Sequence, residues 1–353
     1  MNSFMHRKPL ALSLGGALIL LAAAIIVGMA VIGNGGPGTA VKAEGSAPAI
    51  IAFVDNAGEV VQVRVLTTGN GKVREVGTPD HFDALALAPD GSFVAALALP
   101  RAAGSPINLH IIDSKSGKES VAQLPVESLA SAIAWAPGSA YAGVSGEVSF
   151  VLDRAGAIVA RAGGPEAGSP AATSLASGGY GWSPDGTAFA ALSNGRLHVL
   201  RPRGESSAAS LATLLPGVSP ANVFLLGWTA GPSGASAVVL DTPGGRIAIE
   251  LGATLSARLL TAEEKVADQR TKAAAAAPFV KAAEGSLPSF QATWSRPTAD
   301  GAGAIAELRN STGEIRVVIG SLSDPGAMLR VTGLTAAQAR GGALIDAALL
   351  PGD

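Results

Sequence analysis

The sequence predicts an all-β repeat fold, and the main observation behind this prediction is a motif that returns along most of the chain. The motif is a short apolar run that ends in a turn of the Pro-Asp-Gly type and is followed by a second apolar run. Three clear copies span residues 85–97, 133–144 and 180–192, and two longer, degenerate copies span residues 226–240 and 292–305. Such a recurring period is typical of repeat architectures, in which each repeat is one supersecondary unit.

The second observation is the position of the tryptophans within this motif. The equivalent position in the five copies is occupied by Leu87, Trp135, Trp182, Trp228 and Trp294, at steps of 48, 47, 46 and 66 residues. All four tryptophans of the 353-residue chain therefore fall on one repeat position. We interpret them as side chains that pack between repeats, with a ligand cage as the alternative.

Each motif copy opens a unit with room for four short strands. Proline sets φ at the first corner of the turn, aspartate bonds to nearby amides, and glycine takes the positive φ that closes a hairpin. An alternating third strand follows, as at Arg196–Leu200, and then a weaker fourth strand, as at Ile158–Arg161. Four antiparallel strands in about 47 residues are typical of one blade of a β-propeller.

The two ends of the repeated body each supply part of a blade. Residues 50–76 contain three strands without a preceding first strand, and residues 343–353 contain a first strand and a turn remnant without the rest. We predict that both ends share one closing blade, which leaves no free sheet edge at the closure. Together with five complete blades, this predicts a six-bladed β-propeller over residues 49–353.

The best copy of the motif, Trp182-Ser183-Pro184-Asp185-Gly186, and the next, Ala88-Pro89-Asp90-Gly91, resemble known blade sequences. They are similar to the TolB-like, WD-repeat-like blades of bacterial envelope propellers. The resemblance covers most of residues 50–353. It implies a fold rather than an activity, because propellers carry many unrelated functions.

The first 48 residues differ from the body and predict a membrane anchor. His6, Arg7 and Lys8 precede an uncharged run whose densest apolar part is Leu10–Ile32. As a helix these 23 residues would extend about 34 Å, enough to cross a bilayer. We therefore expect residues 1–33 to form a short stub and a single uncleaved transmembrane helix. A cleavable signal peptide is the alternative, with a cleavage-like Val-Lys-Ala at residues 41–43.

Charge around this span predicts its orientation. Basic residues precede the span and none follows it immediately, which places the N-terminus in the cytoplasm. Residues 34–48 are rich in Gly, Ala and Pro, so we expect a flexible linker there. The propeller is then expected outside the cytoplasm, and the resemblance to envelope proteins implies the periplasmic side of a bacterial inner membrane.

The 66-residue step contains an insertion, at about residues 261–289, in which the apolar period becomes helical. We predict a helix over residues 260–277, with Thr261 and Glu264 as a capping box. Two interpretations remain open: a solvated connector, or an element that docks a partner. Under the second, the candidate partner-binding residues are Glu263, Glu264, Lys265, Asp268 and Arg270.

Composition excludes several kinds of chemistry. Without cysteine the chain has no disulfide, no thiolate zinc site and no thiol nucleophile. A net charge of −2 with 15% charged residues argues against nucleic-acid binding. His81, His110 and His198 lie in different predicted blades without metal-ligand spacing, so we expect structural roles for them. We predict no catalytic, cofactor-binding or metal-binding residue.

Two classes of function fit these observations. The first is a membrane-tethered, extracytoplasmic propeller that is not an enzyme and serves as a protein-interaction or scaffold module. It would act as an accessory subunit of a membrane or envelope complex, with other membrane or envelope proteins as partners. The alternative is an enzyme or ligand sensor that uses the central channel, such as a lactonase-like hydrolase. The predicted innermost strands are almost wholly apolar, which favours the first class.

Overall fold

The computed structural model divides the chain into two compact units, Met1–Ala40 and Val41–Asp353. It describes residues 42–45, 49–54, 60–68, 72–100, 102, 105–125, 130, 132–163, 179–230, 235–252, 254–261, 264, 266–268, 275–332 and 343–350. The predicted span Leu10–Ile32 and most of the predicted linker lie outside these residues. Along the described part of the chain, no helix is both long and apolar enough to cross a membrane.

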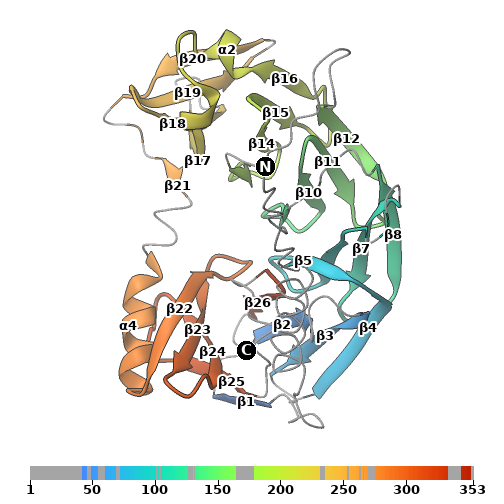
Figure 1. Cartoon of the computed structure of the whole chain (residues 1–353), viewed down its shortest axis with the longest axis vertical. Coiled ribbons are helices and arrows are strands. Elements are labelled where there is room, and N and C mark those ends of the chain that lie inside the picture. Colours follow the sequence, from blue (N-terminus) through green and yellow to red (C-terminus); the bar gives the residue numbers. More distant parts are fainter. Residues whose placement is uncertain are drawn as a thin grey trace, which may run out of the picture. The chain divides into compact units, whose positions relative to one another are not determined.

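The described strands of the second unit form six antiparallel sheets, which follow one another in chain order (Figure 1). Sheet 1 contains β26 (Ile345–Leu349), β2 (Ala49–Val54), β3 (Val61–Thr67) and β4 (Lys72–Asp80). Sheet 2 contains β5 (Phe82–Leu87), β6 (Phe93–Ala98), β7 (Ile107–Asp113) and β8 (Glu119–Leu124). Sheet 3 contains β9 (Ala132–Trp135), β10 (Tyr141–Ser145), β11 (Val148–Asp153) and β12 (Ile158–Gly163).

The remaining three sheets repeat this order, and two of them carry an extra strand. Sheet 4 contains β13 (Tyr180–Trp182), β14 (Phe189–Ser193), β15 (Arg196–Leu200) and β16 (Ser207–Ser210). Sheet 5 contains β17 (Phe224–Ala230), β18 (Ser236–Thr242), β19 (Gly245–Leu251), β20 (Leu255–Leu259) and the added β21 (Ala267–Asp268). Sheet 6 contains β22 (Phe290–Pro297), β23 (Gly303–Asn310), β24 (Ile315–Ser321), β25 (Met328–Thr332) and the added β1 (Lys42–Gly45). Short helical segments at α2 (Leu211–Leu214) and η2 (Pro220–Asn222) connect sheets 4 and 5.

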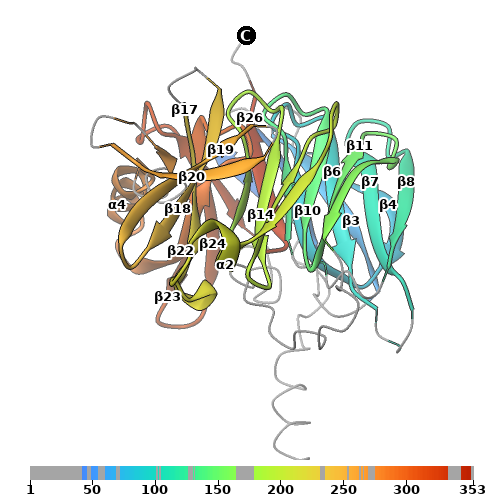
Figure 2. The ribbon, with the colours of Figure 1, turned by 90° about the horizontal axis from the view of Figure 1, so that it is seen from above.

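This topology is that of a β-propeller: among the described residues, six sheets, each built on four antiparallel strands, follow one another along the chain. Figure 2 shows strands of neighbouring sheets running side by side. Sheet 1 confirms the shared closure, because β26 from the C-terminal end pairs with β2 from the N-terminal end. The register runs from Ala49 opposite Leu349 to Phe53 opposite Ile345.

The repeated turns have the predicted chemistry. Gly91 and Gly186 have φ of +70° and +69°, a region that favours glycine. At Gly91 a Cβ would also come within 2.7 Å of the Ile50 side chain. The Asp185 carboxylate accepts a hydrogen bond from the Thr187 amide at 3.1 Å. In the turn after Trp135, Ser139 takes the equivalent position with φ of +56°. The Pro-Asp-Gly chemistry is therefore confirmed at the two copies that contain it, residues 89–91 and 184–186.

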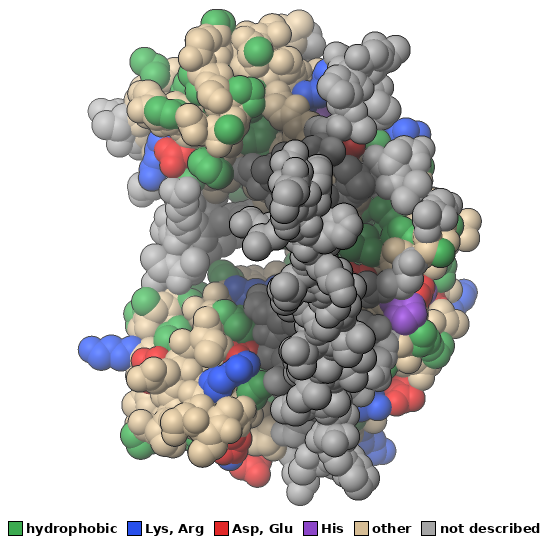
Figure 3. Space-filling model, viewed as in Figure 1, with side chains coloured by type: hydrophobic (Ala, Val, Ile, Leu, Met, Phe, Trp, Pro, Cys, Tyr) green, Lys and Arg blue, Asp and Glu red, His purple; other side chains and the backbone are tan. Residues whose placement is uncertain are grey.

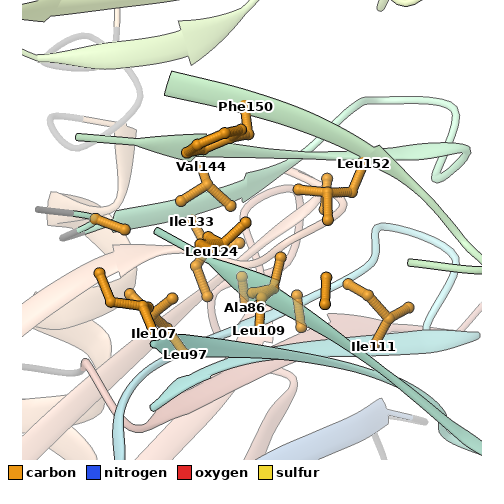
Figure 4. Close-up of a cluster of buried hydrophobic side chains, with 14 of the residues drawn as sticks. Ala86, Leu97, Ile107, Leu109, Ile111, Leu124, Ile133, Val144, Phe150 and Leu152 are labelled. Atoms are coloured by element: carbon orange, nitrogen blue, oxygen red, sulfur yellow. The ribbon is translucent and has the colours of Figure 1, made fainter. Parts of the chain in front are cut away.

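Clusters of buried apolar side chains join consecutive sheets. Between sheets 2 and 3, Leu97 and Leu109 pack with Val144, Phe150 and Leu152 (Figure 4). Similar clusters of described residues join sheets 1 and 2, 3 and 4, 4 and 5, and 6 and 1. Successive side chains of a strand point to opposite faces, so a strand between two such clusters is apolar throughout. This accounts for the nearly continuous burial of β6 and β14.

The tryptophans of the repeat connect these sheets by hydrogen bonds as well as by packing. The indole Nε1–H of Trp135 donates to the Ala86 carbonyl at 3.0 Å, and that of Trp182 donates to the Ala134 carbonyl at 2.9 Å. Trp228 donates in the same way to Gly181 at 3.3 Å. Each acceptor directly precedes the equivalent repeat position of the preceding sheet. A packing role is therefore confirmed for these three residues.

Replacing Trp182 with phenylalanine should lower the free energy of unfolding by about 2 kcal/mol, because the Ala134 carbonyl loses its donor and the cluster loses volume. Urea unfolding measures this change. Hydrogen exchange should also accelerate at β9, the strand that contains Ala134. Trp294→Phe is the contrast, because the Trp294 indole bonds within its own sheet. Equal exchange at β9 in wild type and Trp182→Phe would contradict the inter-sheet role.

Two expectations about the local structure need correction. Lys42–Gly45 lies within the predicted flexible linker, yet it forms β1, which pairs antiparallel with β25. An edge strand offers unpaired backbone groups, so this pairing needs no apolar pattern in the added segment. The predicted helix over residues 260–277 is also wrong, because Ala267–Asp268 is a strand. The insertion does contain a helix, α4 (Ala277–Ser286), but it starts where the predicted helix was to end.

Candidate functional site

The insertion between sheets 5 and 6 is the principal departure from the repeat, and it contains the short strand β21. β21 pairs with the innermost strand of sheet 5, with Gly227 opposite Asp268 and Trp228 opposite Ala267. By repeat position, Gly227 corresponds to Ala86 and Gly181, whose carbonyls accept the indole hydrogen bonds in the earlier sheets. The backbone of the insertion therefore occupies the position at which the next tryptophan would be expected to bond.

Trp294 accordingly has a different partner from the other tryptophans. Its indole Nε1–H donates to Oε2 of Glu307 at 3.0 Å, within sheet 6. Glu307 is only 1% exposed, and its carboxylate also accepts from the Thr293 hydroxyl at 2.7 Å and pairs with Arg309 at 3.3 Å. The series of indole bonds that connects sheets 2 to 5 therefore does not continue from Trp294.

Helix α4 covers one face of sheet 6. Phe279 and Ala283 are fully buried and belong to a cluster with sheet residues Ala304, Ala306, Leu308 and Val318. The Phe279 ring lies over Gly320, where a Cβ would come within 2.7 Å of it. The other face of sheet 6 packs on sheet 1. Among the described residues, no apolar cluster is shared directly by sheets 5 and 6. Helix α4 covers the face of sheet 6 that does not pack on sheet 1.

The outer side of α4 is exposed. Lys281 is exposed on this helix, together with Ala277, Pro278, Gly285 and Ser286. Pro278 suits the first turn of a helix, where its missing N–H is not needed. A helix placed after residue 276 could thus have been found from Pro278 and from the buried spacing of Phe279 and Ala283. The sequence did not single out these residues because the charged segment before them also has a helical pattern.

Glu264 is the one candidate partner-binding residue whose side chain is described, and it is held within the molecule. Both of its carboxylate oxygens accept hydrogen bonds from the Arg258 guanidinium, one of them at 2.7 Å, and Arg258 also pairs with Glu250 at 2.8 Å. The Thr261 amide donates to Glu264 at 2.8 Å, so the capping-box contact exists without the predicted helix. Hydrogen bonding to Arg258 lowers the pKa of Glu264 to about 2. Glu264 therefore attaches the insertion to sheet 5.

The other candidates are less informative. Asp268 pairs with Gly227 through its backbone in β21. Glu263, Lys265 and Arg270 lie outside the described residues. Of the five predicted residues, the described part of the chain therefore places Glu264 and the backbone of Asp268, and their shared role in partner binding stays a prediction.

His110 lies in a buried charged cluster between sheets 1 and 2. Its Nδ1 is 2.6 Å from Oε1 of Glu119, its Nε2 is 3.0 Å from Oδ2 of Asp80, and the residue is 3% exposed. Burial opposes ionisation of Asp80, but hydrogen bonds from Asn108, the His81 backbone and His110 outweigh it and lower the Asp80 pKa. The imidazole connects three strands of two sheets.

His198 is a buried neutral histidine, 1% exposed, with Nδ1 3.3 Å from the Ser149 hydroxyl. Burial, aided by the charge of Arg196, lowers its pKa to about 4. The unfolded chain binds a proton here below pH ~6.5, whereas the folded chain does so only near pH 4. The free energy of unfolding should therefore decrease as the pH is lowered from about 6.5 to about 4, and His198 alone should account for roughly 3 kcal/mol of this decrease. Urea unfolding of wild type and His198→Gln from pH 7 to 4 measures the difference; parallel profiles would contradict it.

The part of the chain that the structure describes contains no group of three or more His, Asp or Glu side chains arranged to hold a metal ion. Acidic and basic side chains are scattered over the face shown in Figure 3. Near the inner strands, Asp346 pairs with Arg296 at 3.3 Å and accepts from the Leu87 amide at 2.9 Å. Burial raises the pKa of Asp346, and Arg296 opposes this shift. This arrangement connects strands β26, β22 and β5.

No protein-family model matches the chain, and no curated protein does either. Solved β-propeller structures do match. TolB from Acinetobacter baumannii is 14% identical with a TM-score of 0.39, over 94% of this chain and 71% of that chain. The β-propeller domain of the Trilobed protease from Pyrococcus furiosus is 8% identical with a TM-score of 0.42, over 81% and 97%. The Cps50 (Swd1) propeller domain from Myceliophteria thermophila is 12% identical with a TM-score of 0.35, over 84% and 88%.

Proposed function

We propose that this chain is a membrane-tethered, extracytoplasmic β-propeller that acts as a protein-interaction module, as an accessory subunit of a membrane or envelope complex. The observation that carries the proposal is helix α4. It interrupts the propeller repeat, is fixed to sheet 6 by Phe279 and Ala283, and leaves Lys281 and its neighbours exposed. A rigid helix on a packed body is a suitable docking element, because little conformational entropy is lost on binding.

The tether follows from the apolar run Leu10–Ile32 and from the pairing of β1. Because Lys42 is already bonded to sheet 6, nine residues separate the run from the body. Nine residues span at most about 30 Å. The proposed anchor would therefore keep the propeller near the membrane surface, where partners in the same membrane are within reach.

Cross-linking with a lysine-reactive reagent on native membranes tests this function directly. Lys281 should form intermolecular cross-links to membrane or envelope proteins that co-purify in mild detergent. Lys118 in the β7–β8 turn, which is also exposed, is the matched control site. Lys281→Arg keeps the charge and should remove the cross-link without loss of co-purification, whereas Lys281→Glu should weaken co-purification several-fold. Partner cross-links from Lys118 with none from Lys281 would refute docking through α4.

A further inference from the structure

A polar cluster lies inside the otherwise apolar packing between sheets 3 and 4. Its members are Ser145 and Ser149 from sheet 3 and Ser193 and His198 from sheet 4, each 8% exposed or less. Nearby, the same two sheets pack through Val151 and Phe189 and other apolar side chains. Such polar groups need hydrogen-bond partners when they are buried.

Strand register places the four side chains on the two facing surfaces. In sheet 3, Gly143 lies opposite Val151, and Ser145 and Ser149 are two residues further along toward the β10–β11 turn. In sheet 4, Ala191 lies opposite His198, and Ser193 is two residues beyond Ala191. Residues two apart in a strand share a face. Ser149 and His198 are in contact across the interface at 3.3 Å, so the two polar surfaces meet.

The hydrogen bonds in this cluster determine what else it needs. The Ser149 hydroxyl lies 3.4 Å from the Gly146 carbonyl, which can only accept, so Ser149 donates to it. Ser149 then accepts from Nδ1–H of His198, which leaves Nε2 as a lone-pair acceptor. This Nε2 and the hydroxyls of Ser145 and Ser193 are buried without a hydrogen-bond partner in the protein. The cluster thus offers one acceptor and two groups that can both donate and accept.

We propose that these three groups form a binding site for ordered water that bridges sheets 3 and 4. Water donates to Nε2 of His198 and exchanges hydrogen bonds with the two serine hydroxyls. A water molecule in such a site makes two to four bonds, which matches the three groups present. An anion lacks the proton that Nε2 requires, and a metal ion lacks an anionic ligand among these side chains.

A double-mutant cycle tests the bridge. Ser145→Ala and Ser193→Ala are on different sheets and do not bond to each other, so without a bridge their effects add. With a bridge, either substitution should destabilise the protein less when the other is already present. In urea denaturation, the product of the two single-variant effects on the unfolding equilibrium constant should then differ from the double-variant effect by at least about threefold. Ser145→Ala combined with Ser114→Ala, which removes a hydroxyl bonded to Gly91 in sheet 2, should be additive. Additivity in the Ser145–Ser193 cycle overturns the proposal.

The protonation state of His198 provides a second, independent readout. At pH 7 the bridge requires a proton on Nδ1 and none on Nε2, and long-range proton–nitrogen NMR spectra distinguish this tautomer. A proton on Nε2, alone or in an imidazolium that holds an anion, overturns the proposal. A high-resolution crystal structure should place a water oxygen about 3 Å from Nε2. Absence of that water, or an anion in its place, would also overturn the proposal.

Discussion

A chain that ends at residue 342 should lose cooperative folding at ambient temperature, or melt at least 15 °C below the full chain. The truncation removes β26, the innermost strand of sheet 1. Leu344, Ile345, Ala347 and Ala348 are each at most 1% exposed, and they belong to the clusters that join sheet 1 to its neighbours. Burial of the leucine and isoleucine alone stabilises by about 4 kcal/mol. That is comparable to the lower end of domain stabilities.

The same strand carries Asp346, whose loss adds to the effect. Its carboxylate accepts from the Leu87 amide in sheet 2 and pairs with Arg296 in sheet 6, so the truncation also removes polar contacts between sheet 1 and both of its neighbours. Thermal unfolding followed by circular dichroism measures the change. A chain that ends at residue 350 retains β26 and is the control. If both truncations melted at the same temperature as the full chain, closure through β26 would not stabilise the fold.

The fold could be predicted from the sequence because each repeat fixes its own turn. The Pro-Asp-Gly chemistry depends on residues within four positions of each other, and the spacing of Trp135, Trp182 and Trp228 reports one structural position in consecutive sheets. The shared closing sheet could be predicted because residues 50–76 lack a first strand and residues 343–353 supply one. These are local signals repeated several times, so errors in one copy did not affect the others.

The insertion and the linker could not be placed in the same way. Thr261 and Glu264 have the spacing of a capping box and do bond to each other, but the segment after them pairs with β17 instead of forming a helix. That preference comes from the free edge of sheet 5, which no local pattern in the insertion reveals. Likewise, Lys42–Gly45 pairs through its backbone with β25, a strand almost 290 residues away in sequence.

The contacts of the candidate site could not be predicted either, because they join residues from different strands. Arg258 binds Glu264, so this one member of the predicted partner-binding set is held within the molecule. The cluster around His110 was also not visible in the sequence, because Asp80, His110 and Glu119 come from three different strands. Their spacing of 30 and 9 residues has no motif character. Only the pairing of β7 with β8 and the packing of sheet 1 on sheet 2 bring them together.

Replacing His110 with leucine should therefore lower the free energy of unfolding by about 3 kcal/mol. Both ring nitrogens lie within hydrogen-bond distance of carboxylate oxygens, so the imidazole bridges Asp80 and Glu119. Leucine fills the space but leaves two carboxylates facing each other near the interface of sheets 1 and 2. Urea unfolding at pH 7 measures the loss.

The two carboxylates that remain in His110→Leu distinguish this loss from a packing defect. Adding Glu119→Gln to His110→Leu removes one of the two opposed carboxylates, so the double variant should be more stable than His110→Leu alone. His198→Leu is the control, because that ring contacts a hydroxyl and the contact between His110 and Glu119 stays intact in this variant. An added Glu119→Gln should therefore lower the stability of His198→Leu. If Glu119→Gln lowered the stability of His110→Leu and of His198→Leu equally, His110 would contribute through packing and not through its contacts with the carboxylates. Because both ring nitrogens of His110 contact these carboxylates, that outcome would also remove the reason for a histidine at this position.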